Sequence, residues 1–104
     1  MSFNKWAFIY LGLGTENPAV DRAVIDSGGL TTTIVAVPDK DAAVAVATEL
    51  VEAGAQSIEL CGAFGSPGAA RVIQAVGDRV PVGVVGYGPE AIPTLAALFG
   101  PTAD

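Results

Sequence analysis

The chain has 104 residues, of which 51% are apolar and 15% are charged, and its formal net charge is −6 at pH 7. This length predicts one domain, spanning residues 1–104. The five basic residues are scattered along the chain. Because nucleic acids and anionic membranes are recognised by clustered lysine and arginine, we expect neither as a partner.

The single cysteine and the lack of histidine exclude several kinds of covalent, catalytic and metal site. The one cysteine excludes an intrachain disulfide, and the absence of histidine excludes Ser–His or Cys–His nucleophile pairs and histidine-ligated metal sites. We expect no cofactor and no metal. The first apolar run, Trp6–Leu13, is far shorter than the ~20 residues of a membrane span and lacks the features of a secretory signal, so a cytoplasmic location is predicted.

Strand-like and helix-like segments alternate four times, beginning with a strand at Lys5–Leu11. Alternation places the aromatic residues Trp6, Phe8 and Tyr10 on one face of this strand, and we predict that they belong to the core. A helix is predicted at Pro18–Ser27, because Asn17 precedes a proline at the first helical position and a glycine pair follows the last.

The second unit is the clearest. Thr31–Val37 is β-branched nearly throughout, as expected of a buried strand. Asp39 is a good N-cap for a helix over Lys40–Ala53, and Gly54 fits the position just after its end.

The third and fourth units follow the same order. Ser57–Cys61 is a predicted strand, and the helix Pro67–Val76 follows it with Ser66 as N-cap. The last strand is Val80–Val85 and the last helix is Pro89–Phe99, which is the most apolar of the four. Low charge together with this apolar helix predicts a homo-oligomer, a dimer, with Pro89–Phe99 in the interface.

This alternation predicts an α/β fold of four βα units with one parallel sheet. Two architectures satisfy it: a flavodoxin-like open sheet, or half of a (βα)8-type barrel that pairs with a second copy.

Ligands of parallel α/β folds bind beyond the carboxyl ends of the strands. The loop after the third strand is rich in glycine and leads into a helix N-terminus, which favours a small polar or anionic ligand. Cys61 would be activated there, although a buried, inert cysteine beside a tight turn fits equally. The predicted ligand-binding residues are Gly62, Phe64, Gly65, Ser66 and Tyr87.

Glu59 is a carboxylate inside an otherwise apolar strand, on the same face as Cys61 by alternation. We expect it to be largely buried, and so to be paired with Arg or Lys or placed in a site as an acid or base; a strand at the edge of the sheet is the further alternative. The candidate catalytic residues are therefore Glu59 and Cys61. The other carboxylates near the same rim, Glu16, Asp39 and Glu90, are more typical of caps and first-turn charges.

The segments Ile58–Gly65 and Val80–Val85, with the opening Lys5–Ile9, resemble a family of short bacterial proteins known as a domain of unknown function. The pattern ELCG-x-FG is the most specific part of the resemblance, which extends over most of the chain. It implies a bacterial cytoplasmic protein with a compact α/β fold, and it carries no catalytic residues across.

Two hypotheses about function remain open, and neither settles whether the protein is an enzyme. The first is a module that binds a small polar or anionic metabolite at the carboxyl-end rim, with proton-transfer chemistry of the lyase or isomerase type. The second is a non-catalytic structural or assembly domain that forms a homo-oligomer.

Overall fold

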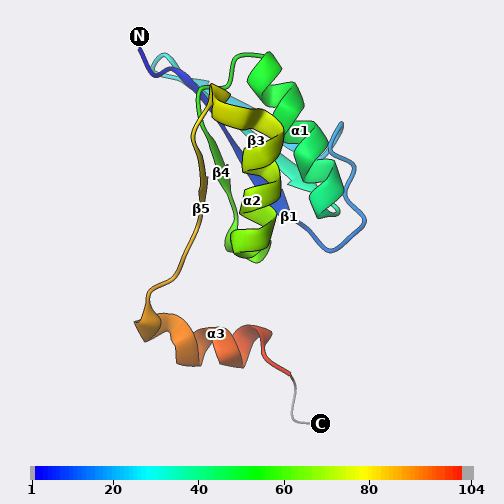
Figure 1. Ribbon diagram of the computed structural model, residues 1–104, viewed down its shortest axis with the longest axis vertical. Coiled ribbons are helices and arrows are strands. Elements are labelled where there is room, and N and C mark those ends of the chain that lie inside the picture. The colour runs from blue at the N-terminus through cyan, green and yellow to red at the C-terminus, as the bar shows by residue number, and fades with distance from the viewer. Residues whose placement is uncertain (1, 102–104) are drawn as a thin grey trace.

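A five-stranded open sheet with strand order β2-β3-β1-β4-β5 organises the molecule (Figure 1). The computed structural model describes residues 2–101. Strands β1 (Lys5–Leu11), β3 (Leu30–Val37), β4 (Ile58–Leu60) and β5 (Val82–Val84) are parallel. The α/β class and the parallel arrangement of these four strands are therefore confirmed. The sheet is open, as in the first of the two predicted architectures, but the prediction of a wholly parallel sheet is wrong, because the fifth strand, β2 (Arg22–Ser27), is antiparallel and makes the sheet mixed.

The segment after β1 differs from the prediction. The helix expected at Pro18–Ser27 is wrong: β2 (Arg22–Ser27) is a strand and pairs antiparallel with β3. Gly28 and Gly29 join the two strands with φ of +63° and +82°, the conformation of a type I′ hairpin turn. The β-branched pair Val24–Ile25 suits this strand. The first of the four predicted βα units is therefore a strand followed by a hairpin.

Three α-helices are present within residues 2–101: α1 (Lys40–Glu52), α2 (Gly65–Val76) and α3 (Ile92–Phe99). Short 3-10 turns stand before α2 (η1, Gly62–Phe64), after it (η2, Gly77–Arg79) and before α3 (η3, Pro89–Ala91). The Asp39 carboxylate accepts a hydrogen bond of 2.8 Å from the Ala42 backbone N–H, as predicted for the N-cap of α1. No helix of these residues is both long and apolar enough to cross a membrane.

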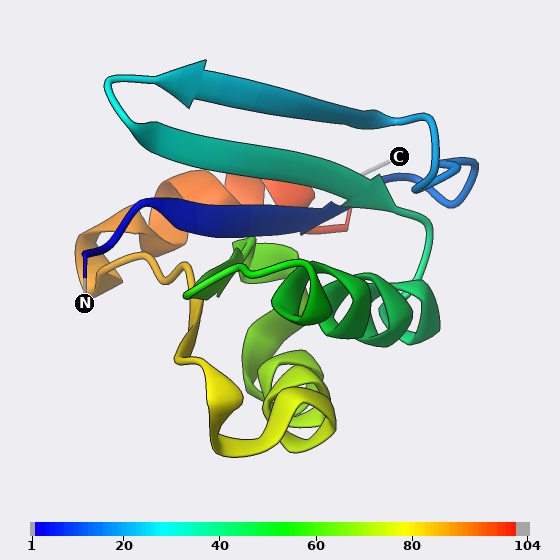
Figure 2. The same ribbon diagram turned by 90° about the horizontal axis from the view of Figure 1, so that it is seen from above.

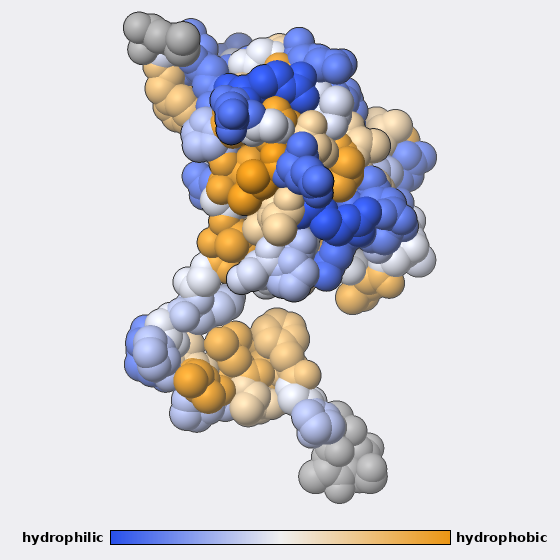
Figure 3. All heavy atoms as spheres, viewed as in Figure 1, coloured by the Kyte–Doolittle hydropathy of each residue, from blue (hydrophilic) through white to orange (hydrophobic). Residues whose placement is uncertain are grey.

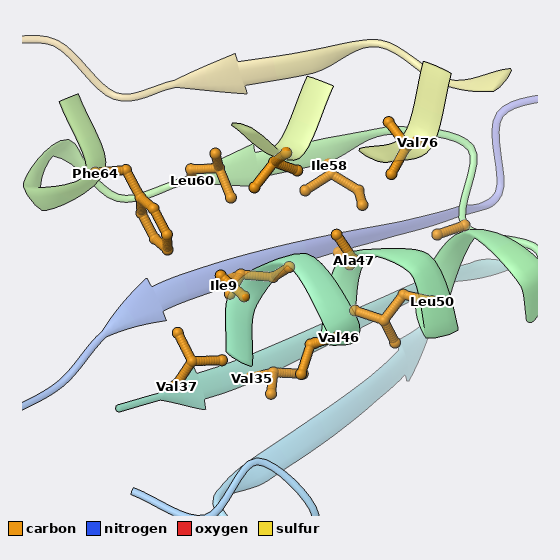
Figure 4. Packing of buried hydrophobic residues seen from close by; sticks show 14 of the residues in the cluster. Ile9, Val35, Val37, Val46, Ala47, Leu50, Ile58, Leu60, Phe64 and Val76 are labelled. Atoms are coloured by element: carbon orange, nitrogen blue, oxygen red, sulfur yellow. The ribbon is translucent and has the colours of Figure 1, made fainter. Parts of the chain in front are cut away.

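Helices α1 and α2 lie on the same face of the sheet (Figure 2), and the core fills the space between the sheet and these two helices. Side chains of β1, β3 and β4 meet those of the helices and η1 there (Figure 4). The largest contributions are fully or almost fully buried aliphatic and aromatic groups, each worth about 1.5–3 kcal/mol of stability: Ile9, Val35, Ile58, Leu60, Leu50, Phe64 and Val76.

The opposite face of the sheet is covered by no helix. Trp6 and Phe8 are only half-buried and Tyr10 is 40% exposed, so the prediction that this stripe belongs to the core is wrong. The stripe is uncovered because neither of two predicted helices lies over it. The first is in fact the strand β2, and the second, α3, stands away from the sheet.

Helix α3 extends the molecule beyond the carboxyl ends of the strands, giving overall dimensions of 50 × 29 × 29 Å. It packs closely against its own leading turn, η3, and only Leu95 and Phe99 face the carboxyl ends of the strands. Much of its visible surface is apolar (Figure 3). Most of the apolar surface of α3 therefore has no apolar partner within residues 2–101.

Candidate functional site

A hollow of about 620 Å³ lies at the carboxyl ends of β1, β4 and β5, between these ends and α3. Its walls include the predicted site residues Cys61, Gly62 and Tyr87. Leu11 contributes from the end of β1, and Leu95 and Phe99 contribute from α3. The structure thus brings these three predicted residues, which follow two different strands, β4 and β5, together at the edge of the sheet where ligands of parallel α/β folds bind.

Cys61 is fixed at the end of β4 by backbone and side-chain contacts. Its N–H donates to the Ile9 carbonyl over 3.1 Å, which continues the parallel ladder with β1 by one residue. Its Sγ accepts a hydrogen bond of 3.3 Å from the Leu11 backbone N–H. The Cys61 side chain is half-buried: it packs against the edge of the core and also forms part of the wall of the hollow.

Gly62 allows a close approach of two strand ends. A Cβ at this position would lie 3.2 Å from the Val85 carbonyl oxygen and 3.8 Å from the Tyr87 ring. A side chain at this position would fit only if the segment after β5 shifted by a few tenths of an ångström. The glycine therefore brings Tyr87 to the hollow.

The remaining predicted ligand-binding residues do not line this hollow. Phe64 is buried in the core, Gly65 is half-buried and Ser66 is exposed. Helix α2 begins at Gly65, directly after η1, so Ser66 lies in its first turn and the prediction that Ser66 is the N-cap is wrong. The sequence predicted an anion site at the N-terminus of this helix. In the structure, the N-terminus of α2 follows directly on the helical turn η1.

The chemistry of the hollow follows from its walls. Its lining contains no charged side chain, and the polar groups on it are the Tyr87 hydroxyl, the Cys61 thiol and backbone amides. Such walls suit a neutral ligand with an apolar body better than an anion. Within residues 2–101, no three His, Cys, Asp or Glu side chains lie close enough together to hold a metal ion.

Glu59 lies elsewhere, and the prediction that it is largely buried is wrong. It pairs in register with Phe8 and Gly83 on the uncovered face, where its side chain is exposed. It lines a separate, shallow hollow of about 370 Å³ beside β5. No ion pair to Glu59 occurs in the described part of the chain. Alternation located its face correctly, but nothing covers that face.

Glu16 is a loop cap, as its position after β1 predicted. Its carboxylate accepts hydrogen bonds of 2.9 Å from the backbone N–H groups of both Leu13 and Gly14. These two bonds hold the pKa of Glu16 below its ordinary value. The Glu16 carboxylate therefore stabilises the loop conformation and is not a candidate acid or base.

A family model described as a family of unknown function (DUF6506) matches residues 4–100. The chain belongs to this family. The match confirms the resemblance expected from the ELCG-x-FG pattern and the strands around it. No curated protein and no solved structure matches this DUF6506 chain.

The feature of this DUF6506 chain that sequence reasoning missed is a surface, which we call the aromatic face. It consists of Trp6, Phe8, Tyr10, Ile25 and Ile34, all on the side of the sheet opposite α1 and α2. The strand register aligns them, because Phe8 pairs with Ile34, and Ile25 pairs with Thr32 beside Trp6. The sequence pattern that could have predicted this surface is the alternation of aromatic residues along β1.

Proposed function

We propose that this protein is a self-associating module that acts as a homodimer through the aromatic face. The observation that carries the proposal is the uncovered side of the sheet, where Ile25 is 53% exposed and Tyr10 is 40% exposed beside two further aromatic rings. Contiguous exposed apolar surface of this kind marks interaction sites. The low charge of the chain and the lack of a second helical layer support the same conclusion.

Energetics favour a second copy as the cover. Burying a large apolar side chain contributes about 1.5–3 kcal/mol, whereas association costs roughly 4–15 kcal/mol in lost freedom of motion. In a twofold dimer every residue of the aromatic face is buried twice, once on each copy. Trp6, Phe8 and Ile34 are already half-buried in one copy, so each contributes less than this full value, but ten side chains in one dimer together would still be comparable with the cost of association.

The test is sedimentation equilibrium over a micromolar concentration range, with two matched variants. Ile25 on the aromatic face and Ile73 on the outer side of α2 are similarly exposed, at 53% and 47%. The native chain and Ile73→Asp should both sediment at twice the 10.4 kDa chain mass, and Ile25→Asp should sediment at 10.4 kDa. A native chain that stays at the single mass, or an Ile25→Asp variant that stays dimeric, would contradict the proposal.

A second candidate function is small-molecule binding in the carboxyl-end hollow. It is favoured by the convergence of Cys61, Gly62 and Tyr87 in a space of about 620 Å³, large enough for a metabolite. Because Glu59 lines a different hollow, we propose binding of a neutral, largely apolar compound here rather than proton-transfer chemistry.

Thermal-shift screening with a panel of neutral aromatic and aliphatic metabolites tests this second candidate, since a ligand of the native state raises the melting temperature. Tyr87→Ala should abolish the shift caused by any compound bound in the hollow. Tyr10→Ala, which changes the same residue type on the aromatic face, should leave that shift unchanged. Loss of the shift in both variants, or in neither, would contradict binding at the hollow.

A further inference from the structure

We infer that α3 of each copy lies on the aromatic face of its partner, so that the two copies exchange their last helices. This inference rests on the proposed dimer and specifies what covers the face. It joins two features of one chain that otherwise have no explanation: a sheet without its second helical layer, and an apolar helix without a sheet.

Helix α3 requires an apolar partner. Ile92, Leu98 and Phe99 are 62%, 70% and 75% exposed, and no charged residue occurs from Ile92 to Phe99. A helix of eight residues is marginal in water by itself, because the cost of nucleation is recovered only over longer helices. A helix that is apolar on all sides is normally buried on more than one side.

The chain leads α3 away from its own aromatic face. Val85 extends the ladder beyond β5, where its N–H donates to the Leu60 carbonyl over 2.9 Å. Gly88 is also extended, with φ of −74° and ψ of 167°. Pro89 then begins η3, and α3 lies past the carboxyl ends of the strands rather than over the sheet. The helix is therefore presented to another molecule.

The dimensions of the two surfaces agree. Eight helical residues span about 12 Å, and the three central strands, β3, β1 and β4, span about 10 Å. Residues Ile92, Leu95, Ala96 and Phe99 follow each other at helical spacing and form one apolar stripe. The stripe is thus long enough to cross the aromatic rings of β1 and the flanking residue Ile34.

The area buried by reciprocal exchange matches that of a stable dimer. A twofold dimer contains two identical contacts between α3 and the aromatic face. With three large apolar side chains on α3 (Ile92, Leu95 and Phe99) and their counterparts on the face, the two contacts bury on the order of 1,000 Å² in all, about the least that a specific stable interface buries.

Cysteine cross-linking of two different chains tests the exchange. In a Cys61→Ser background, one chain carries Thr32→Cys on the uncovered face and the other carries Ala96→Cys on α3. Both changes are small, and both sites are at least partly accessible. After mixing and treatment with a short bismaleimide, the two chains should form a covalent heterodimer. In the matched control, Glu52→Cys on the exposed side of α1 replaces Thr32→Cys, and it should not cross-link to Ala96→Cys.

The other outcomes separate this inference from the proposed dimer. A dimer by sedimentation without the Thr32–Ala96 cross-link would overturn the exchange and leave the dimer intact. If a chain carrying both cysteines links only within itself, α3 folds back onto its own sheet, which also overturns the exchange. A chain that is monomeric by sedimentation would overturn both.

Discussion

Arg22 and Glu49 show how single residues fix the hairpin to the helical layer. Arg22 Nη1 lies 2.9 Å from Glu49 Oε2, and its Nε donates to the Pro18 carbonyl over 2.7 Å. The hydrogen bond from the Arg22 guanidinium lowers the pKa of Glu49 below its ordinary value. The pair therefore stabilises the fold above the unfolded-state pKa of glutamate, and this contribution is lost as the pH falls through the lowered value.

Glu49→Gln should consequently reduce the free energy of unfolding at pH 7, by less than about 1 kcal/mol because the carboxylate is 54% exposed. The reduction should shrink as the pH falls through the lowered pKa of Glu49, so it should be smaller at about pH 3 than at pH 7. Urea unfolding at both pH values measures it. Glu52→Gln on the same helix, which forms no ion pair within residues 2–101, is the control. An equal penalty at both pH values would contradict this account.

In the proposed dimer, the Glu59 carboxylate would oppose the association that the aromatic residues around it favour. It lies beside Phe8 in the register, and covering this face with an apolar helix would remove its charge from water. Glu59→Gln keeps the shape and removes the charge, so it should lower the dissociation constant of the dimer several-fold. Sedimentation equilibrium measures the change, and Glu52→Gln should have none. An unchanged constant for Glu59→Gln would show that the dimer leaves this part of the face in water.

Among the elements, the four parallel strands and α1 could be predicted from the sequence because local and tertiary preferences agree there. Asp39 and Gly54 mark the ends of α1, and the apolar runs of β1, β3, β4 and β5 are typical of buried strands. Residues 18–27 carry conflicting signals: Asn17–Pro18 favours a helix, whereas Val24–Ile25 before Gly28–Gly29 favours a hairpin. Asn17 does cap a turn, accepting from the Ala19 N–H over 3.1 Å, but the turn goes no further.

The hairpin turn gives a prediction about β2 and β3. Both glycines have positive φ, so Gly29→Ala should lower the free energy of unfolding by about 1–2 kcal/mol. Gly28→Asn should cost much less, because asparagine is favoured at the first central position of a type I′ turn. Urea denaturation of the two variants compares them. An equal loss from both changes would contradict the type I′ geometry.

The candidate site could be predicted only in part, because it depends on how separate strands and helices are arranged in space. Cys61, Gly62 and Tyr87 converge because the carboxyl ends of parallel strands share one edge of the sheet, which is a rule of topology. Glu59 was placed on the right face of β4 by alternation. Whether that face is buried depends on where β2 and α3 lie, and strand periodicity alone contains no such information.

Considered as a whole, the molecule has one helical layer, formed by α1 and α2 on one face of its sheet. Its core lies between the sheet and the pair α1–α2, and the other side of the sheet retains aromatic residues without a cover. A second copy that contributes α3 would complete the missing layer. The central claim is therefore that the aromatic face is covered in solution.

Fluorescence of Trp6, the one tryptophan of the chain, reports on this face most directly, because its ring is only half-buried within a single copy. As the protein concentration rises through the micromolar range, its emission should move to shorter wavelength and its quenching by acrylamide should fall. The Ile25→Asp variant should keep the longer-wavelength, readily quenched emission at every concentration. If the native chain and Ile25→Asp have the same emission and the same quenching throughout, the aromatic face is not covered by a second copy.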